Sequence, residues 1–155
     1  MSQNLSQMQQ IYNLFDGFSD DSRVWLYHAN RPITPTEATF VQENLEHFAS
    51  SWKAHSTPLK AKACMLNEYI IVFVVDQTSA SASGCSVDSS VRFVKELGKE
   101  LEVDFFNRMN VVIEDKDGKH SLHPYRKLSE LSDSYYYNPL VENLKSLKEE
   151  WKVKS

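Results

Sequence analysis

Glycine and cysteine are both scarce in this chain of 155 residues, which contains four Gly and two Cys. Neither G-x-G-x-x-G nor G-x-x-x-x-G-K-[ST] occurs, so the common nucleotide-binding loops are excluded. Two cysteines, Cys64 and Cys85, are too few for a disulfide framework and fit a reducing compartment. The stability of the fold must therefore come from an apolar core, which a chain of this length can bury.

Long apolar runs are also absent. The longest, residues 69–75, is far short of the ~20 residues that span a bilayer and has the length of a buried strand. Residues 1–10 lack the basic start and apolar centre of a signal peptide, and we expect them to be flexible. These absences predict a cytoplasmic protein that does not enter a membrane.

The chain has no excess of basic residues, since its formal net charge is -4. Nucleic-acid binders usually present a basic face, so no nucleic-acid partner is expected. The five histidines form no HExxH or C-x-x-C…H pattern, so neither a metal nor a cofactor is expected. A small molecule or a protein remains as the partner, and the oligomeric state is left open.

Hydrophobic periodicity predicts a single α+β domain over residues 1–155. A cap at Thr34, Pro35 at the first helical position and Glu37 three residues after the cap predict a helix over 35–54. A second helix is expected from Ser86 or Asp88 to Leu101, and a last one opens at 138–139 with Leu140, Leu144, Leu147 and Trp151 on one face. Strands are expected at 23–29, 59–66, 69–76 and 110–114, with a hairpin return at 119–123.

This order, βαββαβ, is that of a ferredoxin-like plait, here with an extra C-terminal hairpin strand and C-terminal helices. All four strands should then share one sheet, with both long helices on one face. The expected core consists of Val41, Leu45, Phe48, Trp52, Ile71, Phe73, Val75, Val91, Val94 and Leu101. The fold supports many functions and predicts none of them.

The candidate site is the segment 76–90, where a buried strand delivers Asp76 to a loop of small residues. Gly84 is free to adopt a positive φ, and Cys85 precedes the start of a helix. Helix starts offer unpaired N–H groups that bind anions and stabilise a thiolate. We therefore expect ligand contacts from Gly84, Ser86, Asp88, Ser89 and Ser90. Ser86 or Asp88 as a plain helix cap is the structural alternative.

Two functions fit this segment. The first is a binding or regulatory domain that holds a small ligand or a partner at 76–90. The alternative is a thiol-dependent enzyme or redox sensor, with Cys85 as nucleophile, His28 or His55 as base, and Asp76 or Asp88 as orienting carboxylate. The sequence does not decide whether the protein is an enzyme, and the first function is preferred because it needs only backbone donors and hydroxyl groups.

Several short stretches resemble a family of small bacterial proteins often labelled "ABC transporter ATPase". They are Arg23-Val24-Trp25-Leu26-Tyr27, Asn30-Arg31-Pro32, Trp52 with Ala54-His55, Ser83 to Ser90, and Phe106-Asn107-Arg108. The resemblance covers most of residues 23–113, and its most specific part is Ser-Gly-Cys-Ser-x-Asp. It implies no catalytic residue, because the family has no established activity. ATP hydrolysis would need a phosphate-cradling loop with a Lys, which this chain lacks.

Overall fold

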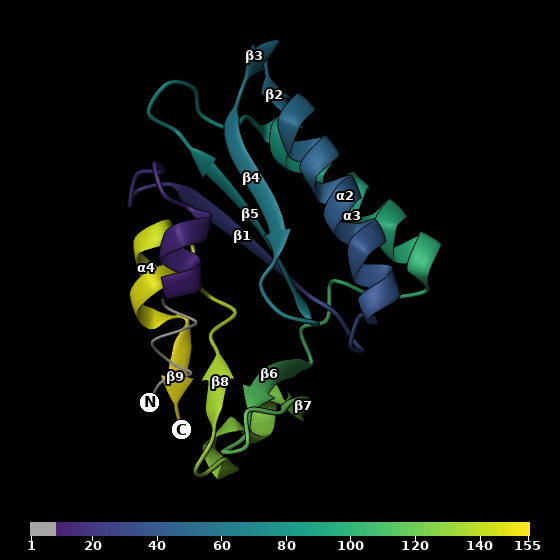
Figure 1. The fold of residues 1–155 in the computed structure, drawn as a ribbon, viewed down its shortest axis with the longest axis vertical. Helices are drawn as coiled ribbons and strands as arrows, with labels where there is room; N and C mark the ends of the chain where they lie inside the picture. The colour runs from purple at the N-terminus through teal and green to yellow at the C-terminus, as the bar shows by residue number, and fades with distance from the viewer. Residues whose placement is uncertain (1–8) are drawn as a thin grey trace.

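A computed structural model describes residues 9–155 and shows two antiparallel sheets with helices around the first (Figure 1). The first sheet contains β1 (Arg23–His28), β4 (Lys60–Met65) and β5 (Ile70–Asp76), in the order β1-β5-β4. Every residue of β5 is buried, as its continuous apolar run predicts for a central strand. No helix of the described part of the chain is long and apolar enough to cross a membrane.

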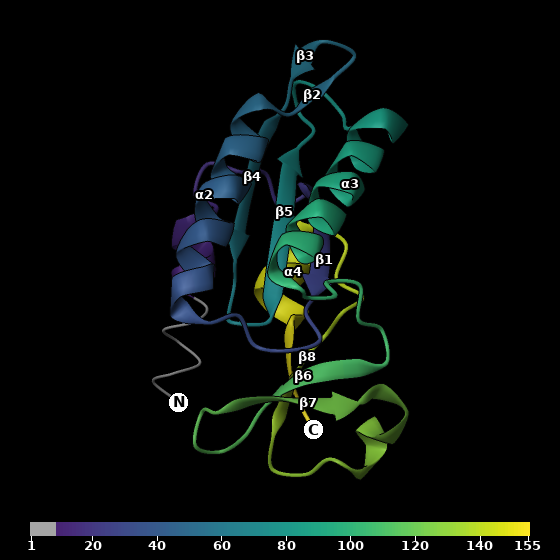
Figure 2. The same cartoon turned by 90° about the vertical axis from the view of Figure 1, so that its right-hand side faces the viewer.

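Two long helices cover one face of this sheet, α2 (Pro35–Ser51) and α3 (Gly84–Leu101) (Figure 2). Their apolar side chains meet those of β5 that point to the same face, at Ile71, Phe73 and Val75. Seven of the ten expected core residues are buried, and Phe48, Val91 and Leu101 are half-buried. The prediction that both helices pack on one face is confirmed.

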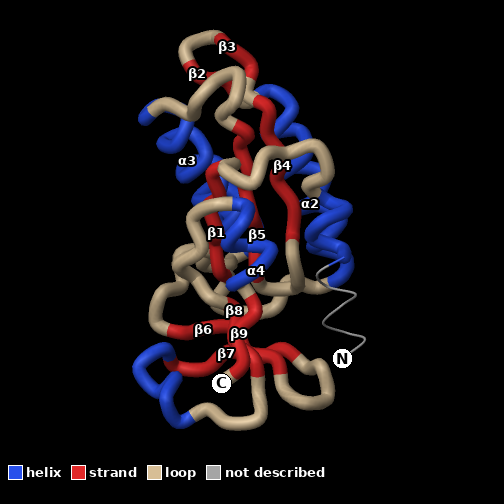
Figure 3. The backbone as a smooth tube through the Cα atoms, turned by 90° about the vertical axis from the view of Figure 1, so that its left-hand side faces the viewer, coloured by secondary structure: helices blue, strands red, loops and turns tan. Residues whose placement is uncertain are grey.

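The opposite face of the sheet is covered by α4 (Leu144–Glu150) and a short helix over residues 9–14 (Figures 1 and 3). Ile70, Val72 and Val74 of β5 point to this face and pack against Leu144 and other buried residues. Because side chains alternate along a strand, β5 contributes to a separate core on each face.

The second sheet has the order β7-β6-β8-β9 and lies beyond one end of the first (Figure 1). Its strands are β6 (Asn110–Glu114), β7 (His120–Pro124), β8 (Tyr135–Tyr137) and β9 (Lys152–Lys154). The 3₁₀ helix η1 (Tyr125–Glu130) follows β7, and a small ribbon of β2 (Lys53–Ala54) and β3 (Thr57–Pro58) follows α2. The α+β class is confirmed, as is the β6–β7 hairpin.

The ferredoxin-like plait is not confirmed, because only three of its four strands share a sheet. The expectation that 110–114 joins them is wrong, since β6 pairs with β7 and β8 instead. The free edge of β1, where the fourth strand would lie, is occupied at two points by other segments. Asn143 forms a bridge with Arg23, and Phe106 forms one with His28. Such long-range pairings leave no local mark in the sequence.

The helix boundaries also differ from the prediction in three places. Helix α2 ends at Ser51 and not at residue 54, because Lys53–Ala54 form β2. The last helix covers only Leu144–Glu150, and the preceding residues 138–143 run beside β1, so Leu140 is exposed rather than on a buried face. Helix α3 begins at Gly84, earlier than expected. By contrast, α2 begins as predicted, with a capping box formed by Thr34 and Glu37. The carboxylate of Glu37 has a pKa of about 2, first because Arg31 donates to it.

Candidate functional site

The predicted segment 76–90 is polar, but most of its polar groups bond to each other or to their neighbours. The carboxylate of Asp76 accepts hydrogen bonds from the amide and hydroxyl of Thr78 and from the amide of Ser19. These bonds, the Thr78 hydroxyl first, lower its pKa to about 2. Lys60 Nζ lies 3.5 Å from the same carboxylate. Asp76 therefore links the turn at residue 19 to the end of β5 by a hydrogen bond.

The start of α3 is capped by Ser83, so the structural alternative, in which Ser86 or Asp88 is the cap, is wrong. Ser83 Oγ accepts from the Ser86 amide at 3.1 Å, and Ser86 Oγ accepts from the Ser83 amide at 3.2 Å. Ser86 Oγ also donates to the Lys53 carbonyl, and Trp52 Nε1 donates to the Ser86 carbonyl. Ser86 is thus buried and serves to attach the helix start to the chain beyond α2.

The hydroxyl groups of Ser89 and Ser90 are used within the helix. Ser89 Oγ donates to the carbonyl of Ser86, and Ser90 Oγ donates to the carbonyl of Val87. Ser90 is completely buried. Gly84, Cys85 and Asp88 are exposed, and Gly84 has no positive φ. Anion binding at this helix start stays a prediction.

His28 lies at the other end of the sheet from Asp76. In the antiparallel β1–β5 pair, His28 is opposite Ile70, whereas Arg23 is opposite Val75. Six residues of strand, or about 20 Å, separate Ile70 from Asp76. His55 lies in the turn between β2 and β3 and is exposed. The structure therefore does not bring His28 together with Asp76, and no hydrogen bond within residues 9–155 connects either histidine to Cys85.

A groove of about 710 Å³ lies beside the free edge of β1, and we call it the β1 groove. Residues 24–28 of β1 all line it. Val87 and Val91 reach it from α3, which covers one face of the sheet, and Leu140 reaches it from the segment that leads to α4 on the other face. Val91 was expected in the core but is half-buried at the groove. The buried residues of α3 are Ser86, Ser90, Val94, Leu97 and Gly98, of which only Val94 was expected.

Two residues that line the groove each have one buried polar atom without a hydrogen-bond partner in the described part of the chain. These atoms are His28 Nε2 and Asn107 Nδ2. The His28 side chain is 5 % exposed, and burial lowers its pKa to about 4, so the ring is neutral near pH 7. Asn107 Oδ1 accepts from the Met109 amide, which leaves the amide nitrogen free. An unpaired buried polar group costs roughly 1–3 kcal/mol.

Exposed apolar side chains gather near the mouth of this groove. Leu140 and Tyr125 line it and are 70 % and 42 % exposed. Met109, which is 78 % exposed, accepts a backbone hydrogen bond from Tyr125 and so lies beside it. These are three of the five large apolar side chains that are exposed within residues 9–155. Apolar groups clustered on a surface are typical of a binding site.

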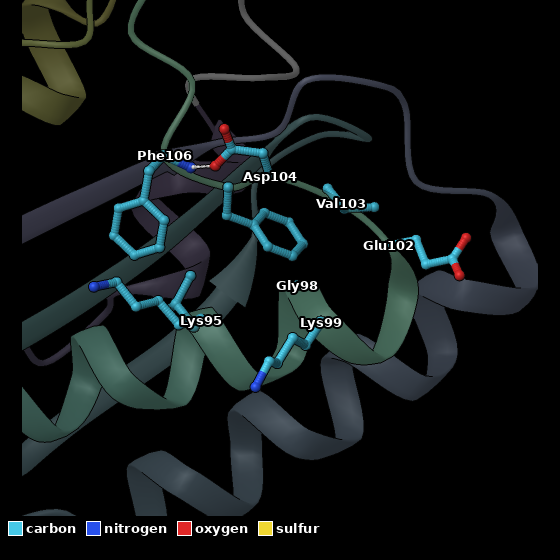
Figure 4. Close-up of a pocket in the computed structure, with 9 residues that line it drawn as sticks. Lys95, Gly98, Lys99, Glu102, Val103, Asp104 and Phe106 are labelled. Atoms are coloured by element: carbon cyan, nitrogen blue, oxygen red, sulfur yellow. Dashed lines mark hydrogen bonds between the residues drawn. The ribbon is translucent and has the colours of Figure 1, made fainter.

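A smaller hollow of about 320 Å³ lies at the end of α3 (Figure 4). The Asp104 carboxylate there accepts from the Phe106 amide at 2.8 Å, and Lys95 Nζ lies 5.8 Å from the centre of the Phe106 ring. A Cβ at Gly98 would lie 2.4 Å from the Val103 carbonyl oxygen, so glycine is needed for the chain to turn here. This hollow is explained by the helix end and offers no unpaired buried group.

A second polar cluster, which the sequence did not predict, joins the two sheets. His120 Nδ1 lies 2.7 Å from Glu68 in the β4–β5 turn, and Nε2 lies 3.0 Å from Glu114 in β6. The Tyr137 hydroxyl also donates to Glu114, and Lys152 forms an ion pair with it. Burial raises the pKa of Glu114, but Lys152, then His120, lower it overall. Because these side chains pair with one another, the cluster serves to hold the two sheets together.

Sequence reasoning missed the β1 groove because its walls come from five separate segments. Its polar members are single residues with no motif around them. Two stretches that carry the family resemblance, 23–27 and 106–108, also contribute to its walls, but the resemblance implies no function for them. A further signal was Leu140, an apolar residue placed just after Pro139 and before the short last helix. Hydrophobic periodicity assigned that residue to a buried face, so the signal was interpreted as packing.

No family model matches the chain, and neither the curated proteins nor the solved structures contain a match. Within residues 9–155, no three His, Cys, Asp or Glu side chains are arranged to hold a metal ion. The site must therefore be interpreted from its own geometry.

Proposed function

We propose that this protein is a non-catalytic binding domain that holds a small organic molecule in the β1 groove. The observation that carries the proposal is the pair of unpaired buried polar atoms, His28 Nε2 and Asn107 Nδ2, in residues that line one groove. Buried polar groups are nearly always paired, and exceptions need an explanation such as a missing ligand or water. A ligand in the groove, or a water held beside it, would supply a partner.

The size and lining of the groove support a small molecule. Pockets for such ligands measure roughly 300–1,000 Å³ and are mostly apolar, with a few polar groups that orient the ligand. The β1 groove falls in this range, and its lining combines aromatic and aliphatic side chains with His28 and Asn107. The predicted segment 76–90 contributes Val87 to the wall, so the proposed site only borders the predicted one.

The thiol-dependent alternative has less support. Cys85 is exposed at the start of α3, which suits a reactive thiol, but no hydrogen bond within residues 9–155 connects it to His28, His55, Asp76 or Asp88. Asp76 is fully engaged by Ser19 and Thr78, and His28 lies at the opposite end of the sheet. A nucleophile needs a base within hydrogen-bond reach, or a pKa lowered by its surroundings. Binding needs neither.

The proposal is tested by NMR on the full chain labelled with ¹⁵N. A panel of small neutral heterocycles, carboxamides, carboxylic acids and sugars is titrated while the backbone amides are followed. At least one member should give saturable shifts at Leu26, His28 and Asn107, with residues 84–86, which do not line the groove, unaffected. Shifts confined to residues 84–90 would support the predicted helix-start site instead. A panel without any saturable shift at the groove would overturn the proposal.

A pair of matched variants adds a second measurement. His28→Phe keeps a ring of similar size but removes Nε2, and His123→Phe makes the same change in β7, outside the groove. We expect His28→Phe to weaken binding of the best panel member about tenfold, because one hydrogen bond is lost and a ligand group is left unpaired. His123→Phe should bind as the unaltered protein does. Equal affinities for all three proteins would show that His28 makes no ligand contact.

A further inference from the structure

The edge of β1 that faces the groove has a defined pattern of open backbone groups. Along an antiparallel strand, alternate residues direct both N–H and C=O away from the partner strand. Val24 donates to the Glu142 carbonyl, and the His28 carbonyl accepts from Asn107, so the even-numbered residues point away from β5. Leu26, which lies between them, does the same.

Three groups on this edge are left open. No residue in the described range 9–155 forms a hydrogen bond on this side with the carbonyl of Val24, or with the N–H and carbonyl of Leu26. In order along the strand they are an acceptor, a donor and an acceptor. These groups lie within residues 24–28, and all five of these residues line the β1 groove.

The open stretch is too short for an added strand. Val24 and His28 are the two ends of this stretch. They are four residues or about 13 Å apart, and both already bond to other segments. A peptide strand that paired with Leu26 would place its next outward-facing residues where Glu142 and Asn107 now lie. Only a group about one residue wide fits between the two bridges.

The walls favour a flat group at this position. Val87 and Val91 approach from the α3 face, and Pro139 and Leu140 belong to the segment that leads to the opposite face. Phe106 also lines the groove and packs edge to face on Tyr27, with ring centres 5.4 Å apart. A ring that continues the plane of the sheet would lie between these apolar side chains, which suits aromatic stacking.

The charges favour a neutral ligand. Burial lowers the pKa of His28 and so keeps its ring uncharged near pH 7. Arg108 and Glu142 both line the groove, and their opposite charges give it no net sign. An anionic or cationic ring would therefore gain little there.

We propose that the β1 groove binds a neutral nitrogen heterocycle of the aminopyrimidine class, which carries an amino group beside a ring nitrogen. The amino group donates to the carbonyl of Leu26 or Val24, and the ring nitrogen accepts from the Leu26 N–H. This inference rests on the proposed function and specifies the ligand chemistry of the same site.

The ligand test uses 2-aminopyrimidine with 2-methylpyrimidine as its matched control. The methyl compound keeps the size and the ring nitrogens but cannot donate. We expect 2-aminopyrimidine to give saturable shifts centred on Leu26, and 2-methylpyrimidine to bind about tenfold more weakly. Equal affinities, or no shift at Leu26 with either compound, would overturn the inference.

The protein test changes the donor itself. Leu26→Pro removes the N–H that faces the groove, and an edge strand tolerates proline where its N–H points away from the sheet. Leu26→Ala shortens the same side chain but keeps the N–H. We expect 2-aminopyrimidine binding to be lost in Leu26→Pro and retained within about threefold in Leu26→Ala. If Leu26→Pro does not fold, the comparison of 2-aminopyrimidine with 2-methylpyrimidine tests the inference by itself.

The two proposals can fail separately. If a carboxamide or a sugar from the panel binds at Leu26 and Asn107 while 2-aminopyrimidine does not, the binding function stands and the ligand class is wrong. If no compound reaches the groove, both are wrong.

Discussion

The α3 start and the β1 groove lie beside the same helix and differ in whether their polar groups have partners. At the α3 start, Ser83 and Ser86 bond to each other, and Asp76 bonds to Ser19 and Thr78. In the groove, His28 and Asn107 each keep a buried atom unpaired within the described chain. A polar stretch of sequence therefore does not by itself indicate a binding site. Paired groups stabilise the fold, whereas a buried group without a partner needs an explanation such as a ligand or a water.

The largest expected effect comes from the core shared by both regions. Phe73 contacts Trp52, which bonds to the α3 start, and Tyr27, which lines the groove. Phe73→Ala should lower the free energy of unfolding by about 3–5 kcal/mol, because it leaves a cavity in a fully buried position. Chemical denaturation measures the change. A loss below ~1 kcal/mol would mean that the two regions do not share this core.

The stability of the protein should depend on pH through His28, which lines the groove. The pKa of His28 is about 4 in the folded protein, against 6.5 for a histidine in water, so the unfolded chain binds the proton more strongly. Stability is therefore highest above pH ~6.5 and falls as the pH drops toward ~4, by on the order of 2–4 kcal/mol. Denaturation at several pH values, with His28→Phe alongside, measures the effect. The variant should lose this part of the dependence; an unchanged profile would contradict the assignment to His28.

The α3 start should behave as a structural cap. Ser83→Ala removes the acceptor of the Ser86 amide and should cost about 1 kcal/mol of stability, with no effect on a ligand in the β1 groove. Ser81→Ala, at an exposed position in the same loop, is the control and should cost less than ~0.5 kcal/mol. Thermal unfolding and the NMR titration together test both statements. Weaker groove binding in Ser83→Ala would show that the two regions are coupled.

The smallest effect is expected at Cys85. Because its side chain is exposed, Cys85→Ser should change the free energy of unfolding by less than ~0.5 kcal/mol and leave groove binding unchanged. Denaturation and the same titration measure this. A large loss of binding on this substitution would restore the thiol to the functional site and remove the contrast between the two regions.

Local signals in the sequence determined individual elements well. Thr34, Pro35 and Glu37 predicted the start of α2, because a capping box depends only on residues within one turn. The apolar run before Asp76 predicted the central strand, because a strand buried on both faces needs apolar residues at every position. The segment 76–90 was correctly placed at a strand end and a helix start, although Ser83 and not Ser86 or Asp88 is the cap.

Only the tertiary structure decided which segment lies beside β1. Residues 106 and 143 are far apart in the chain, yet both bridge its free edge and leave Leu26 open between them. No periodicity or motif encodes that arrangement, because sheet edges are assigned by competition among distant segments. For the same reason the sequence could identify His28 as a strand-end histidine but could not place it in a groove with Asn107, away from Asp76 and Cys85.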